Sequence, residues 1–115
     1  MPRTLVDLLI EKTKREEKYF KNYLKYAGRI KKEAQELLGD VRVFIFGSIL
    51  KKNEIPQDID VLIVSRNLTD YGVKSKTQRR LRKNIGIFSP FEIHLVTPEE
   101  YNSWWKYFLK EKLEI

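Results

Sequence analysis

The stretch Phe46–Val64, FGSILKKNEIPQDIDVLIV, decides the fold. It opens with the turn-forming pair Gly47-Ser48 and ends in an apolar, β-branched strand, which Asp58 and Asp60 enter from its N-terminal side. Because side chains alternate along a strand, both aspartates point to one face, and that face becomes apolar farther along the strand. Two carboxylates so close together repel each other and raise each other's pKa unless a cation lies between them.

The segment before this stretch has the pattern of a helix. Apolar residues recur at intervals of three and four from Phe20 to Leu38, as on one face of an α-helix. This phase is kept across Gly28, and an earlier leucine cluster precedes it. We therefore expect one long helix over residues 3–38, ended by Gly39-Asp40.

The rest of the chain alternates strands and helices. Strands are predicted over residues 41–46, 59–65 and 91–96, and helices over residues 71–85 and from Thr97 onward, where Glu100 completes a capping box. The 11-residue connection between the first two strands is too short for a helical crossover, so these strands should pair antiparallel. The order α-β-β-α-β-α predicts an α/β (α+β) fold, with a small mixed sheet of three or more strands flanked by helices.

The last helix carries an aromatic stripe that we expect to cover one face of the sheet. Its members are Tyr101, Trp104, Trp105, Phe108 and Leu109. A platform for base stacking is the alternative interpretation of the same residues.

Composition limits the class of protein. At 115 residues the chain is expected to form a single domain over residues 1–115, and 42% hydrophobic with 34% charged residues is typical of a globular protein. No apolar run approaches the roughly 20 residues of a membrane span, and no signal peptide is recognised, so we expect a cytoplasmic protein with no membrane partner. Without cysteine there is neither a disulfide nor a thiolate metal site. High Lys and Glu content without cysteine is also found in thermophiles.

Positive charge is concentrated in one segment. Residues 66–84 contain seven Lys or Arg and one Asp, a net +6 of the chain's formal +7. Such a patch favours an anionic ligand, a nucleotide or RNA, although a solvated basic helix face would look the same. Spacing does not select which of Arg79, Arg80, Arg82 and Lys83 would touch a substrate.

A third acid completes a candidate metal site. Glu92 is out of phase with the apolar residues of its strand, so its carboxylate can lie beside Asp58 and Asp60 if the two strands are neighbours. Mg²⁺ is the hard cation best suited to a few carboxylates together with substrate phosphates. Solvated aspartates at a strand end are the alternative. His94 shares the face of Glu92 and could approach the site, or simply form a hydrogen bond within the sheet.

These residues resemble a known family. A strand followed by Gly47-Ser48 and, after nine intervening residues, by Asp58-Ile59-Asp60 is similar to the hallmark of the DNA polymerase β-type nucleotidyltransferase superfamily. The resemblance is nearest to its small archaeal and bacterial minimal nucleotidyltransferases, and it extends through the segment 92–101, EIHLVTPEEY.

The resemblance implies a polymerase β palm-like fold and a mechanism. Asp58, Asp60 and Glu92 would hold two Mg²⁺ ions, while Gly47 and Ser48 would bind the β- and γ-phosphates of a nucleoside triphosphate, with Lys51 as a further nucleotide-binding residue. A hydroxyl would then attack the α-phosphate, with ATP as the expected donor of AMP. Lys51 and Lys52 stand where relatives commonly have Arg-Gly; Lys51 keeps the positive charge but not the bidentate fork. Gln57 stands where a serine is frequent.

The resemblance also implies a partner. Minimal nucleotidyltransferases are often paired with a helical HEPN protein as antitoxin and toxin, so the expected partners are a nucleoside triphosphate, a HEPN protein and, through exposed apolar residues, a second copy of the chain. A catalytically weak module that neutralises a HEPN protein without turnover is the first alternative, and a small RNA-binding domain is the second.

Overall fold

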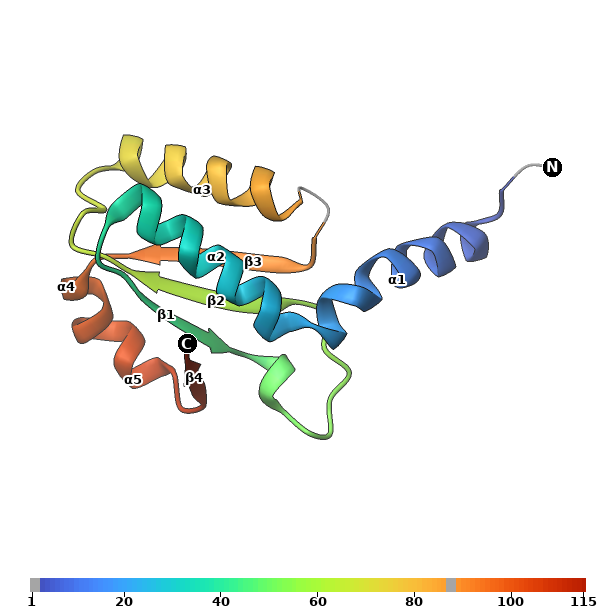
Figure 1. Ribbon diagram of the computed structural model, residues 1–115. Coiled ribbons are helices and arrows are strands. Elements are labelled where there is room, and N and C mark those ends of the chain that lie inside the picture. Colours follow the sequence, from blue (N-terminus) through green and yellow to red (C-terminus); the bar gives the residue numbers. More distant parts are fainter. Residues whose placement is uncertain (1–2, 87–88) are drawn as a thin grey trace.

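The computed structural model describes residues 3–86 and 89–115. In these residues, a four-stranded sheet and the helices packed against it make up the body of the fold (Figure 1). The strands are β1 (Arg42–Phe46), β2 (Ile59–Val64), β3 (Phe91–Val96) and β4 (Lys112–Glu114). The helices before β3 are α1 (Leu5–Lys21), α2 (Tyr23–Leu38) and α3 (Tyr71–Ile85), with a 3-10 turn, η1 (Ser48–Leu50), after β1.

The predicted long helix is divided in two, so the prediction of one unbroken helix was wrong. The break lies at Asn22, whose backbone leaves helical geometry at φ −118° and ψ 33°. Its side-chain amide donates to the carbonyl of Lys18 at 3.0 Å, the local side-chain bonding by which asparagine competes with a helix. Gly28 lies inside α2, as predicted. The division lets α1 extend away from the body (Figure 1).

The sheet has the order β3-β2-β1-β4. β1 and β2 pair antiparallel, as the short connection predicted, whereas β2 and β3 pair parallel across the α3 crossover. β4 pairs antiparallel with the other edge of β1 and was not predicted. The sheet is therefore mixed, and the predicted fold class is confirmed.

Two cores form on the two faces of the sheet. Ile59, Val61 and Ile63 of β2 pack on one face with residues of α2 and α3, including Ala27, Ile30 and Leu81. Leu62 and Val64 pack on the opposite face with Phe44, Tyr101 and Leu109. The alternation of β2 between the two faces is the one read from the sequence, and it directs Asp60 to the second face.

The C-terminal helical stretch covers this second face only in part. It comprises α4 (Pro98–Glu100), a π-helical turn η2 (Tyr101–Trp105) and α5 (Lys106–Phe108). The capping box between Thr97 and Glu100 is present, as predicted. Tyr101 and Leu109 are buried against the sheet as predicted, but Trp104 and Phe108 are 53% and 57% exposed, so the prediction was wrong for these two residues of the stripe. The π-helical turn changes the helical phase of the stripe, which accounts for the exposed rings.

No helix in the described part of the chain is long and apolar enough to cross a membrane.

Candidate active site

Two predicted acids meet where β2 and β3 begin. Asp60 and Glu92 are partners in the parallel register of these strands, so their side chains lie side by side on one face. His94 follows two residues later on the same face. One carboxylate oxygen of each acid and one imidazole nitrogen lie within 4.8 Å of one another. The three side chains form what we call the acid cluster.

His94 approaches the acids rather than serving only the sheet. Its Nε2 lies 3.4 Å from Oδ1 of Asp60. The ring is held between Phe46 and Trp105, with centroid distances of 5.5 Å and 5.4 Å. A partly buried imidazole with aromatic neighbours can orient a carboxylate for a metal ion, because carboxylates that bind metals are themselves hydrogen-bonded by surrounding groups.

The two carboxylates of the cluster repel each other, and this affects the pKa of Glu92. The hydrogen bond between the Glu92 and Asp60 side chains raises the pKa of Glu92 above its usual value; desolvation and the negative charges of Asp58 and Asp60 add to this, and His94 opposes it. Among the described residues, no lysine or arginine lies within ion-pair distance of Asp58 or Asp60. A hard cation would remove this repulsion, so the donor set fits a divalent metal ion.

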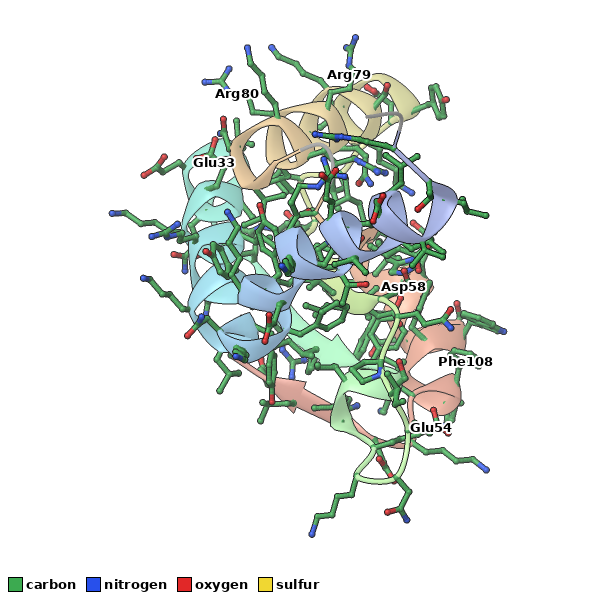
Figure 2. All side chains as sticks on the ribbon, turned by 90° about the vertical axis from the view of Figure 1, so that its right-hand side faces the viewer. Glu33, Glu54, Asp58, Arg79, Arg80 and Phe108 are labelled. Carbon is green, nitrogen blue, oxygen red and sulfur yellow. The ribbon has the colours of Figure 1, made fainter. Side chains whose placement is uncertain are left out.

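Asp58 lies just outside this cluster. It precedes the first residue of β2 and is exposed, and its carboxylate does not belong to the group of ligand atoms within 4.8 Å. Its charge nevertheless contributes to the raised pKa of Glu92, so it lies near enough to act on the site. Figure 2 views this end of the molecule and labels Asp58.

The Gly47-Ser48 turn comes into direct contact with the cluster. Gly47 has φ +88°, and a Cβ placed on it would clash with Oδ2 of Asp60. Only glycine therefore allows the backbone to pass so close to this carboxylate. Ser48 then opens η1, in which the Lys51 amide donates to the Ser48 carbonyl at 3.0 Å. A phosphate bound at this turn would lie against the acid cluster.

A cavity of about 400 Å³ adjoins the turn. Gly47, Lys51, Phe108 and Lys110 line it, together with Phe46, Leu109 and Glu111. Lys51, predicted to bind phosphate, thus borders this space, although it lies 3.7 Å from Glu54. Lys110 was missed by sequence reasoning, because only the chain path after α5 brings it to the same cavity as Gly47. No local pattern around Lys110 could have revealed it.

The other predicted positions lie apart from the cluster. Lys52 and Gln57 are exposed in the connection before β2. Arg79 and Arg80 point outward from α3, on the far side from Asp58 (Figure 2), and Arg80 lies 3.9 Å from Glu33.

Comparisons with known proteins agree with this geometry. The family model described as nucleotidyltransferase domain matches residues 27–114. A crystal structure of a protein assigned as a nucleotidyltransferase superposes with a TM-score of 0.66 at 28% identity, over 76% of this chain and 95% of that one. A second, from Sulfolobus solfataricus, shares the fold with a TM-score of 0.54 at 22% identity, over 91% of this chain and 83% of the other. No curated protein matches the sequence.

Proposed function

The chain belongs to the nucleotidyltransferase domain family, and from this premise we propose that it transfers a nucleoside monophosphate, AMP from ATP, to a hydroxyl acceptor with Mg²⁺ as cofactor. The observation that carries the proposal is the acid cluster lying directly against the glycine turn. A carboxylate pair for the metal and a backbone turn for the phosphates are the two parts that phosphoryl transfer needs at one place.

Each residue has a role in this reaction. Asp60 and Glu92, with Asp58 at the strand entrance, would hold the metal ions, and His94 would orient Asp60. Gly47 and Ser48 would bind the β- and γ-phosphates, with Lys51 and Lys110 neutralising charge in the cavity. Bound Mg²⁺ would supply charge neutralisation along the triphosphate.

The step balances without another reactant. The acceptor oxygen forms a bond to the α-phosphorus, and the bond from that phosphorus to the α,β-bridging oxygen breaks. Pyrophosphate leaves with the electron pair, and the hydroxyl proton passes to the carboxylate of Glu92. Phe108, which lines the cavity and is 57% exposed, offers a flat apolar surface to the base of the donor nucleotide.

A partner protein would bind the exposed apolar face of α1. The family match begins at residue 27, so the whole of α1 lies outside the matched region. Several large apolar side chains of α1 are exposed, among them Leu5 at 72% and Leu9 at 53%. We infer that this face of α1 docks a helical partner, a HEPN protein in an antitoxin–toxin pair, as in the minimal nucleotidyltransferases.

Radiolabel transfer tests the proposed activity. The protein is incubated with Mg²⁺ and each of the four nucleoside triphosphates labelled in turn at the α-phosphate, with a HEPN protein and with nucleic acid as acceptors. Among the four labelled nucleotides, ATP should be the one that passes its label to an acceptor. Asp60→Asn and Glu92→Gln should abolish transfer, whereas Glu99→Gln, which removes an exposed carboxylate outside the cluster, should not. Equal labelling by wild type and Asp60→Asn would refute the proposal.

The non-catalytic alternative has its own observation in its favour. Lys51 shares its charge with Glu54, and Lys52 and Gln57 depart from the family pattern. Titration calorimetry with ATP separates the two functions. A module without turnover would bind ATP weakly and equally with and without Mg²⁺, whereas the transferase should require the metal for tight binding.

A further inference from the structure

A second cavity, of about 580 Å³, lies outside the acid cluster and is strongly basic. Lys14, Arg15 and Lys18 of α1 line one wall, and Lys83 at the C-terminal end of α3 lines the other, together with Tyr19, Gly86 and Ser89. Among the residues that the structure describes, four cations and no carboxylate line it. Within the described residues, none of these four cations forms an ion pair, whereas neighbouring Lys12 and Lys21 do. We call this space the basic cavity.

The wall of the basic cavity is built rather than incidental. The Tyr19 hydroxyl donates to the carbonyl of Ile85 at 3.3 Å and so ties α1 to the end of α3. The Tyr19 ring packs against Phe91, the first residue of β3, with centroids 6.2 Å apart. The cations of α1 are thereby held over the end of the sheet where β2 and β3 begin, the end from which α1 leaves the body in Figure 1.

The basic cavity adjoins the acid cluster along the chain. Ser89 lines the cavity, and the next residue, Pro90, accepts a hydrogen bond at 2.9 Å from the amide of Ile59, which lies between Asp58 and Asp60. Glu92 follows three residues after Ser89. Three residues span at most about 11 Å, even when extended.

The cations and the acids occupy different faces. Tyr19 packs with the core on the face of the sheet that α2 and α3 cover, whereas Asp60 belongs to the opposite face. Phosphate groups can therefore lie in the basic cavity without meeting the carboxylates, while a hydroxyl a short distance away reaches Glu92. Stacked nucleotides advance by about 3.4 Å each. The span of at most about 11 Å from Ser89 to Glu92 therefore corresponds to about three nucleotides.

We propose that the basic cavity binds the phosphodiester backbone of a single-stranded RNA acceptor, whose terminal ribose hydroxyl then lies at Glu92. This rests on the proposed function for the transfer step, but the binding site itself does not. Four lysine or arginine side chains without counter-ions fit a run of phosphates, since each cation can replace counter-ions condensed on the strand.

Binding is measured first, in EDTA and without nucleotide, so that it is independent of catalysis. The affinity of a fluorescein-labelled single-stranded RNA is followed by anisotropy from 50 to 300 mM salt. The double variant Lys14→Gln/Lys18→Gln is compared with Lys76→Gln/Arg79→Gln, which removes two charges from α3 away from the cavity. Loss of two phosphate contacts should lower the salt slope by about 1.4 and weaken binding about 25-fold at 0.1 M salt. In the control variant, neither the salt slope nor the affinity should change by more than about twofold.

The outcomes separate the two proposals. Equal weakening in both double variants, or no RNA binding at all, overturns the basic cavity as an RNA site. Competition by inorganic tripolyphosphate as tight as that by RNA also overturns it, since the cavity would then serve a small anion. Cavity-dependent RNA binding without labelling of any acceptor would support the site and refute the proposed transferase. Labelling of a protein acceptor but never of RNA would support the transferase and overturn RNA as its acceptor.

Discussion

The contact between Gly47 and Asp60 allows a sharp test, because the chain offers a second glycine as a matched control. Gly47 has φ +88° and ψ −159°, in a region that is almost exclusive to glycine. An alanine Cβ there would also clash with the Asp60 carboxylate. Gly28, in the middle of α2, has nothing within 4 Å of an added Cβ. The same substitution should therefore have opposite effects at the two positions.

The magnitudes follow from these environments. Gly47→Ala should cost about 1–3 kcal/mol of unfolding free energy through backbone strain. Gly28→Ala should add about 1 kcal/mol, since alanine has the higher helix propensity. For a chain of this size 1 kcal/mol corresponds to about 4 °C in Tm, so the two variants should differ by about 8–16 °C. Displacing the Asp60 carboxylate by about 1 Å should also reduce transfer about 100-fold in Gly47→Ala.

Thermal unfolding by circular dichroism measures the first effect, and transfer of α-phosphate label measures the second. Gly28→Ala should retain wild-type activity, which controls for the substitution itself. If Gly47→Ala unfolds at the wild-type temperature and transfers label at the wild-type rate, the turn does not lie against the cluster and the reasoning fails.

Three further predictions concern charge and packing. The raised pKa of Glu92 means that the folded state binds its proton more tightly than the unfolded state does, so the stability of the metal-free protein should fall as pH rises through and above 4.5. Glu92→Gln should therefore raise Tm at pH 7 in EDTA, and an unchanged or lower Tm would contradict this. The hydrogen bond from Arg42 lowers the pKa of Glu114, so the stabilisation of β4 by this pair is present above pH 4.5 and lost as pH falls below it. The amide of Ile115, which donates to the carbonyl of Val43, should then lose its protection from hydrogen exchange. A Glu114→Gln variant that keeps full protection at pH 7 would argue against the pair. Leu81→Ala, at a site 1% exposed, should lower the free energy of unfolding measured in urea by about 2–5 kcal/mol. The control Leu24→Ala, at a site 50% exposed, should lower it by at most about 0.5 kcal/mol. Similar losses in the two variants would show that α3 does not pack as described.

The sequence predicted those features that depend on local periodicity. Alternation along residues 59–64 assigned each side chain of β2 to its face, and the out-of-phase position of Glu92 placed its carboxylate beside Asp60 once the strands became neighbours. The bounds of α3 agreed with the prediction because its caps, Asp70 and Gly86, carry strong local signals.

The features that were missed depend on contacts distant in sequence or on small local competition. β4 has three exposed residues and exists only through pairing with β1, so no pattern within it could reveal it. The break at Asn22 leaves the apolar phase intact, and a single side-chain hydrogen bond decides it. Likewise, Lys110 and the basic cavity arise from chain segments that only the folded structure brings together.

The crossover through α3 has a consequence for how the protein matures. Asp60 and Glu92 become neighbours only when two parallel strands, separated by an entire helix, have docked. Such pairing closes a long loop and belongs to the slow events of folding. An incompletely folded chain therefore lacks the paired carboxylates, and affinity for a divalent ion becomes a gauge of how much of a preparation has reached its native topology.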